Sequence, residues 1–302
     1  MRPTKFLNIK NSNESIIHKT LISLLLPACK TVERANLELG WIKQELPESS
    51  WLKACQDRNR LIPLQYILGN QPFGSLDIKC TPNVLIPRND TEDWCIELQE
   101  LINNNIDSGI TIADICTGTG CIALSLAESQ KIEIAKGFDI STHAINLSLE
   151  NKIRNKSHLP NFKNIGFQIG DIFNSNILNG EKFDLITSNP PYILEEDLLS
   201  DEKSGGVEES VKIYEPMLAL KGDCEFYEAL VSNVIIPSEC KAFVFELGYM
   251  KQAEFTMEKL RYLSKDLWES GLRYDSGNNI RNIIAWKAHS DYKFLSQMVS
   301  RN

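Results

Sequence analysis

Apolar residues in the first part of the chain recur at the spacing of helices. Between residues 31 and 46 they return every three or four positions, with Thr31 as a candidate N-cap and Pro47 as the stop. A second, shorter helix is expected from Ser50. The pattern therefore predicts a helical module at the N-terminal end.

From residue 110 onward the pattern changes to short apolar runs that alternate with amphipathic segments. The runs predict strands at 110–116, 132–140, 165–169, 183–188, 242–247 and 280–286. The segments between them predict helices at 121–129, 142–154, 224–235 and 250–263. Such a βαβ series predicts an α/β fold whose mainly parallel sheet is covered by helices on both faces.

The residues between these two regions follow neither pattern. They predict a β-hairpin with its turn near Gly74, then a strand that ends at Pro87, then a helix opened by Asp90 or Thr91. Arg88, just before that helix, suits a carboxylate ligand, but a surface ion pair is the preferred interpretation. We expect three parts: a helical module at 1–70, a β-hairpin linker at 71–92 and a larger α/β domain at 93–302.

Composition and charge narrow the function classes. The net charge of −8 argues against a nonspecific grip on nucleic-acid phosphates, which needs clustered Lys and Arg. No apolar run approaches the ~20 residues of a membrane helix, so no membrane association is expected. The 8 cysteines form no Cys-x-x-Cys pair and the 4 histidines are scattered, which predicts free thiols in a reducing compartment and no metal site.

The first thirty residues are basic within this acidic chain. Five Lys and Arg residues face a single acid, Glu14. This bias is typical of a weak organellar presequence, and equally of a basic disordered tail.

The tetrapeptide Asn189-Pro190-Pro191-Tyr192 follows one of the predicted strands directly. The Asn189 side-chain oxygen and the Pro190 carbonyl are two acceptors on a stiff backbone, and they match the two N–H bonds of a planar NH2 group. Such a grip leaves the nitrogen lone pair facing an electrophile, while Tyr192 adds an aromatic wall. The alternative is a Pro-Pro turn in which Asn189 caps its own backbone.

A glycine-containing loop lies where the first predicted strand meets the next helix. Gly118 and Gly120 allow a close backbone approach, and Asp139, at the end of the following strand, can accept both hydroxyls of a ribose. This pattern fits a dinucleotide or S-adenosylmethionine. The clamp for an NH2 group favours the methyl donor, because a nicotinamide enzyme has no use for one. Asp171 offers a further acceptor for the adenine amine.

Taken in order, these motifs resemble the HemK/PrmC family of release-factor glutamine methyltransferases, most of all its fungal mitochondrial branch. The signature segments are Leu64–Ile67, Leu85–Arg88 with Thr91 and Glu92, the glycine loop, Asn189–Tyr192, Tyr214–Pro216 with Ala219 and Leu220, and Glu246–Gly248.

The resemblance implies a seven-stranded, Rossmann-like methyltransferase fold with S-adenosylmethionine as cofactor. The implied substrate is the glutamine of the Gly-Gly-Gln loop of a class I peptide release factor, methylated on its amide nitrogen, and the implied location is mitochondrial. The implied catalytic residues are Asn189, Pro190, Pro191 and Tyr192. The implied cofactor-binding residues are Asp114, Cys116, Thr117, Gly118, Thr119, Gly120, Asp139, Asp171, Ile172 and Asn189.

Three positions depart from the family pattern. Cys116 stands where many members have glycine, Asp90 replaces a common glutamate, and Ile172 occupies the place of an aromatic residue against the adenine. The alternative functions are a DNA or RNA amine methyltransferase, a cofactor-binding scaffold without activity, and an NAD-dependent enzyme. The acidic run at 195–212 is expected either to steer a basic partner or to form a solvated flexible loop.

Overall fold

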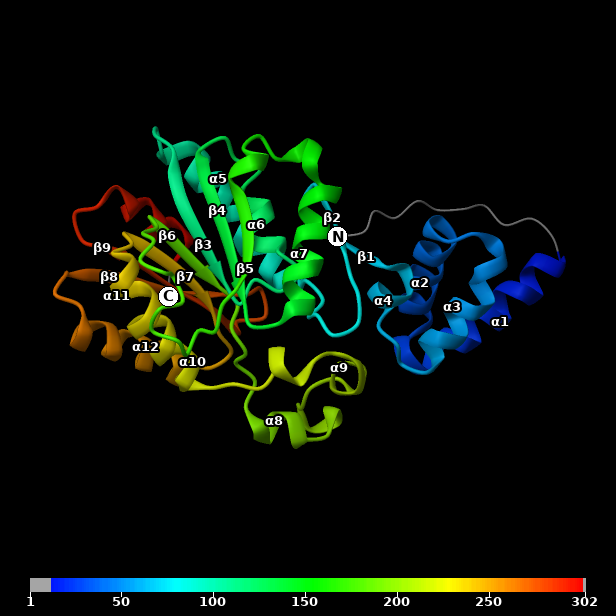
Figure 1. Ribbon diagram of the computed structural model, residues 1–302. Helices are drawn as coiled ribbons and strands as arrows, with labels where there is room; N and C mark the ends of the chain where they lie inside the picture. The colour runs from blue at the N-terminus through cyan, green and yellow to red at the C-terminus, as the bar shows by residue number, and fades with distance from the viewer. Residues whose placement is uncertain (1–11, 301–302) are drawn as a thin grey trace.

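The computed structural model describes residues 12–300, and its first four helices form a small bundle (Figure 1). The bundle consists of α1 (Ser12–Cys29), α2 (Val32–Glu45), α3 (Glu48–Asn59) and α4 (Leu64–Leu68). Its core contains Leu21, Leu25, Leu39, Ile42 and Cys55, all buried. Thr31 caps α2 by accepting the backbone N–H of Arg34, as the sequence predicts.

Helix α1 corrects the expectation of a disordered basic tail over residues 12–29. Its Leu21 and Leu25 are buried against the neighbouring helices, so this part of the basic stretch belongs to the folded bundle. Residues 1–11, which carry three of the five basic residues, lie outside the described part of the chain.

A hairpin follows the bundle. Strands β1 (Asn70–Phe73) and β2 (Leu76–Lys79) pair antiparallel, and Gly74 has a positive φ of 58° in the turn, as predicted. The expected strand ending at Pro87 does not form. The Ile86 N–H donates instead to the Glu215 carboxylate at 3.1 Å, and Pro87 has no N–H to give to a ladder.

The sheet domain contains seven strands in the order β5-β4-β3-β6-β7-β9-β8. Five of them are parallel, and β9 pairs antiparallel with both β7 and β8. Their bounds are β3 (Ile110–Ile115), β4 (Ile132–Asp139), β5 (Ile165–Ile169), β6 (Leu185–Ser188), β7 (Ala242–Glu246), β8 (Trp268–Tyr274) and β9 (Ile280–Lys287). The six strands expected from sequence are present, and the seventh, β8, is a partly exposed edge strand without a buried face of its own.

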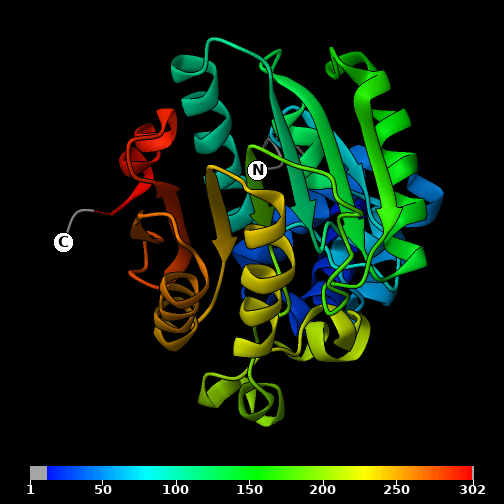
Figure 2. The ribbon, with the colours of Figure 1, turned by 60° about the vertical axis from the view of Figure 1, so that its left-hand side comes forward.

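Helices cover both faces of this sheet (Figures 1 and 2). One face packs against α5 (Asn89–Asn105), α6 (Cys121–Leu126) and α7 (Thr142–Arg154), around the fully buried Trp94. The other packs against α10 (Cys224–Ala229), the π-helix η5 (Leu230–Ile235), α11 (Ile236–Ser238) and α12 (Met250–Leu263). The sheet order and these two layers confirm the expected α/β methyltransferase fold.

The remaining helices are short. Figure 1 shows α8 (Glu195–Leu199) and α9 (Glu209–Tyr214) beside the edge of the sheet where the parallel strands end. The 3₁₀ turns are η1 (Lys156–His158), η2 (Phe162–Asn164), η3 (Glu202–Ser204), η4 (Met217–Ala219) and η6 (Asp291–Met298). We propose a domain boundary near residue 70, because the bundle has a core separate from the two cores of the sheet. The boundary near residue 92 stays a prediction, since Phe73, Leu76 and Ile78 of the hairpin pack in the same core as Trp94.

Candidate functional site

The strand order reverses between β3 and β6, and open α/β sheets bind ligands at such a point. A cavity lies there, at the carboxyl ends of the parallel strands. It is lined by the loop after β3, the residues after β4 and β5, the linker before α5, and Asn189 with Pro191 after β6. The fold therefore brings the predicted cofactor loop and Asn189, one half of the predicted NH2 clamp, to one cavity, whereas Pro190 and Tyr192 do not line it.

The glycine loop turns sharply into α6 through three residues with positive φ, Cys116, Gly118 and Gly120. A Cβ at Gly120 would lie 2.9 Å from the ring of Phe167, so the backbone packs closely there. At Gly118 a Cβ would meet nothing within 4 Å, because this residue faces the cavity. Cys116 has a φ of 59°, in the left-handed region. This conformation costs a residue with a Cβ roughly 1–2 kcal/mol, and glycine would avoid that cost.

Asp139 ends β4 and holds the glycine loop from the side. Its two carboxylate oxygens accept the backbone N–H groups of Gly118 and Ser141, each at 2.9 Å. Each oxygen keeps a further lone pair, and the half-buried side chain lines the cavity. Asp139 can therefore accept ligand hydroxyls without losing the bonds that fix it.

Asp114 lies behind the loop and is completely buried. Its carboxylate accepts the hydroxyls of Thr117 at 2.6 Å and Thr187 at 2.8 Å, which ties the loop to β6. Thr119, also nearly fully buried, completes the loop. The position of Asp114 suits support of the loop, whereas Cys116, Thr117, Gly118 and Thr119 line the cavity itself.

Apolar side chains form another wall of the cavity. Ile172 is 5% exposed and packs into the core, while Ile140 and Phe173 are 49% and 53% exposed. Phe173 meets the ring of Phe226 edge-on at 5.2 Å between centroids, and its N–H donates to Asp171. Asp171 and Ile172 were predicted from the sequence, whereas Ile140 and Phe173 were not, although Ile140 directly follows Asp139 and Phe173 lies two residues after Asp171.

The Asn189–Tyr192 corner is held by the segment around Gly222. The Ile193 N–H donates to the Leu220 carbonyl at 2.9 Å, and the Gly222 N–H donates to the Ile193 carbonyl at 3.1 Å. The chain approaches so closely that a Cβ at Gly222 would lie 2.2 Å from the carbonyl oxygen of Pro191. Pro190 and Pro191 are buried, so the corner is rigid.

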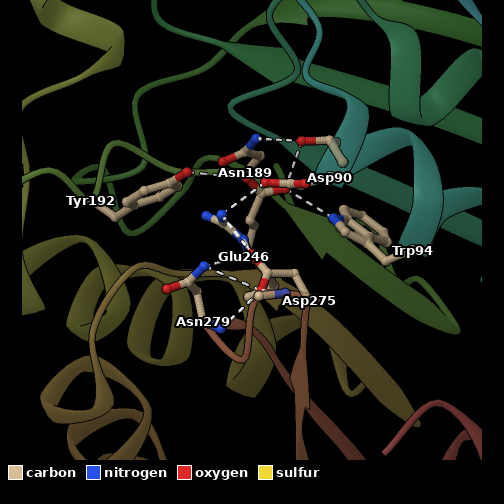
Figure 3. Close-up of polar contacts among 10 residues, drawn as sticks. Asp90, Trp94, Asn189, Tyr192, Glu246, Asp275 and Asn279 are labelled. Atoms are coloured by element: carbon tan, nitrogen blue, oxygen red, sulfur yellow. Dashed lines mark hydrogen bonds and ion pairs between the residues drawn. The ribbon is translucent and has the colours of Figure 1, made fainter. Parts of the chain in front are cut away.

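A buried hydrogen-bond network lies behind this corner (Figure 3). The amide nitrogen of Asn189 donates to the Thr91 hydroxyl at 3.2 Å. The Glu246 carboxylate accepts from Thr91 at 2.7 Å, from the Trp94 indole at 2.9 Å and from the Tyr192 hydroxyl at 3.2 Å. Burial raises the pKa of Glu246, which these donors and the nearby Arg281 oppose. The polar tip of Tyr192 thus points toward Glu246.

The sequence offered no role for this network. Thr91 appeared only as a helix opener and family signature, Glu246 only as part of a signature, and Trp94 was not singled out. Thr91 and Glu246 lie 155 positions apart in the chain. Their contact depends on the packing of α5 against β7 and has no local sequence signal.

Arg88 pairs with Glu215 at 2.7 Å. The Glu215 side chain is only 1% exposed, so this ion pair is largely buried and differs from the surface pair expected.

The acidic run at 195–212 forms α8, η3 and α9 rather than a featureless loop, and Glu202 pairs with Lys30 of the helical bundle. This segment therefore connects the bundle to the side of the sheet where the parallel strands end.

Within residues 12–300, the structure contains no cluster of three or more His, Cys, Asp or Glu side chains placed to hold a metal ion. No helix in that range is long and apolar enough to cross a membrane. All eight cysteines are free in the structure.

Comparisons with known proteins identify a methyltransferase domain and similar proteins. A family described as "Methyltransferase domain" matches residues 106–254. The mitochondrial MRF1 N(5)-glutamine methyltransferase MTQ1 of Saccharomyces cerevisiae is 39% identical over 288 residues, covering 92% of this chain and 87% of that protein. The release factor glutamine methyltransferase of Thermodesulfovibrio yellowstonii is 32% identical over 232 residues, covering 75% of this chain and 74% of that one.

Solved structures resemble the chain in fold. The catalytic domain of hMettl16 in complex with a MAT2A 3'UTR hairpin superposes with a TM-score of 0.55 at 16% identity, covering 79% of this chain and 83% of that one. The N-terminal domain of human METTL16 in complex with SAH gives a TM-score of 0.50 at 17% identity, covering 78% and 84%. At this identity the likeness concerns the fold alone.

Gly222→Ala should destabilise the corner by overpacking. The added Cβ would collide with the Pro191 carbonyl, and forced repacking of this kind costs about 1–3 kcal/mol. The matched control is Gly166→Ala on β5, where a Cβ meets nothing within 4 Å. Urea unfolding of both variants should show a loss of unfolding free energy only for Gly222→Ala; equal effects would contradict the close approach.

Asp114 should make stability fall with rising pH. Burial raises the pKa of Asp114 from 3.8 to about 7, so between these values the folded state binds a proton that the unfolded state has released. The resulting loss of stability is absent below about pH 4 and complete above about pH 7. Asp114→Asn does not titrate, so its melting temperature minus that of the wild type should be larger at pH 8 than at pH 5. A difference independent of pH would contradict this assignment.

Proposed function

The chain belongs to the release factor glutamine methyltransferases, and from this premise and the geometry of the corner we propose that it methylates the glutamine of the Gly-Gly-Gln motif in a class I peptide release factor. The methyl group passes from S-adenosylmethionine to the side-chain amide nitrogen. The observation that carries the proposal is the Asn189 amide, fixed at the end of β6 with its nitrogen bonded to Thr91 and its side chain on the cavity wall.

The cavity suits the cofactor, S-adenosylmethionine, on three counts. Asp139 has lone pairs free for the ribose hydroxyls, Gly118 leaves open space beside the loop, and Ile140, Ile172 and Phe173 offer apolar contact for the adenine. When bound, this cofactor supplies a methyl group already activated by a sulfonium. Asp114 would act indirectly, by holding Thr117 and therefore the loop.

The acceptors at the corner would hold the substrate amide. The Asn189 side-chain oxygen and the Pro190 carbonyl each accept one N–H bond of the glutamine, which directs its nitrogen lone pair toward the methyl group. A carboxamide nitrogen is a weak nucleophile, so orientation must supply much of the rate, and well-oriented reactants can gain roughly 7–11 kcal/mol. The same two oxygens stabilise the nitrogen as it becomes positive. We assign no general base; the proton can leave to water after transfer.

A protein substrate is preferred over a nucleic acid. The net charge of −8 does not favour a phosphate backbone, and the acidic segment at 195–212 beside the catalytic edge suits a basic partner. A mitochondrial release factor is the proposed substrate and mitochondria the proposed location, because the similar yeast protein is named as a mitochondrial MRF1 methyltransferase.

Asn189→Ala should lower kcat by at least about 100-fold while cofactor affinity stays within about 3-fold, because the lost acceptor acts on the reacting nitrogen. The assay is transfer of labelled methyl from S-adenosylmethionine to a mitochondrial class I release factor, with calorimetry for cofactor binding. The control substrate carries Gln→Ala in its Gly-Gly-Gln loop and should receive no label. Wild-type turnover by Asn189→Ala, or equal labelling of both substrates, would contradict the proposal.

A further inference from the structure

The network behind Asn189 joins three elements within the core. Thr91 and Trp94 come from the first turns of α5, Glu246 ends β7, and Asn189 follows β6 (Figure 3). The first three are 2%, 0% and 1% exposed. Water therefore has little access to their polar atoms, and the hydrogen bonds among these side chains decide which atom donates and which accepts.

The direction of these bonds is set from the Trp94 end. An indole N–H can only donate, so Oε2 of Glu246, 2.9 Å away, must accept. The Thr91 hydroxyl lies 2.7 Å from the same oxygen and gives its single hydrogen to it. Thr91 then has only lone pairs left for its other neighbour.

That neighbour is Asn189, which must turn its NH2 group toward Thr91 to make the 3.2 Å bond. Figure 3 shows the amide nitrogen of Asn189 on the side of this bond and the amide oxygen on the other. Rotating the amide by half a turn would set its oxygen against the lone pairs of Thr91. It would also present NH2 to the cavity, where it would repel the NH2 of a substrate.

We propose that Glu246 and Thr91 are positioning residues, which orient the Asn189 amide so that its oxygen faces the substrate. This inference rests on the proposed function, since it assigns the origin of the acceptor used there. The hydroxyl of Tyr192 donates to the other carboxylate oxygen of Glu246 at 3.2 Å, which ties the last residue of the corner to the same group.

The test compares Thr91→Val with Thr91→Ser. Valine keeps the shape of threonine but has no hydroxyl, whereas serine keeps the hydroxyl and loses a methyl group. If the hydroxyl orients Asn189, Thr91→Val should lower kcat on the release factor by about 10- to 100-fold, while KM and cofactor affinity stay within about 3-fold of wild type. The kcat of Thr91→Ser should stay within about 3-fold of wild type. If Thr91 only fills space, serine should be the more damaging change, and that order would overturn the proposal.

A second readout needs no substrate. In ¹⁵N-labelled protein, the side-chain NH2 protons of Asn189, identified by their loss in Asn189→Asp, should exchange with solvent at least about 10-fold faster in Thr91→Val than in wild type or Thr91→Ser. Unchanged exchange would overturn the proposal even if the wild type is active. Faster exchange in Thr91→Val, combined with a wild type that does not methylate the release factor, would support the orientation and reject the proposed substrate. Thr91→Ala replaces Thr91→Val if the latter does not fold.

Discussion

The hydrogen bond from the Asn189 amide to the Thr91 hydroxyl is the interaction on which the active corner depends. An asparagine amide is nearly symmetric in shape but opposite in polarity at its two ends, so it is useful as an acceptor only if something determines its orientation. Here a buried carboxylate with a donor-only indole on the same oxygen imposes that orientation. The chemistry proposed for the corner thus begins with a network in which Asn189 and Thr91 reach the cavity wall, while the buried Trp94 and Glu246 lie behind them.

The rest of the fold keeps this network and the cofactor loop in register. The β3 and β6 strands lie side by side, so the glycine loop and the corner leave the sheet as neighbours. The buried Asp114 carboxylate links the glycine loop to β6, because it accepts the hydroxyls of Thr117 and Thr187. On the outer side, Gly222 packs against Pro191, and the buried Glu215 holds Arg88 and the linker. Each of these contacts fixes one wall of the cavity, and the walls come from distant parts of the chain.

The sequence predicted the features that have a local signal. The alternation of apolar runs yielded six strands, and the glycine loop and Asn189 fell at strand ends, where parallel sheets bind ligands. Edge strand β8 was missed because its half-exposed residues show no apolar run. The strand expected before Pro87 failed because a side chain, Glu215, takes the N–H of Ile86. Thr91, Trp94 and Glu246 could not be assigned roles, since their contacts join positions more than 150 residues apart.

The proposed reaction depends on two fixed oxygens that bind the primary carboxamide of the substrate. The most direct measurement is a crystal structure of the protein with S-adenosylhomocysteine and a peptide containing Gly-Gly-Gln. We expect the glutamine amide nitrogen at about 2.9 Å from both the Asn189 side-chain oxygen and the Pro190 carbonyl, with the Asn189 nitrogen still on Thr91. A glutamine nitrogen bound elsewhere, or an Asn189 that presents its own NH2 to the peptide, would contradict the account.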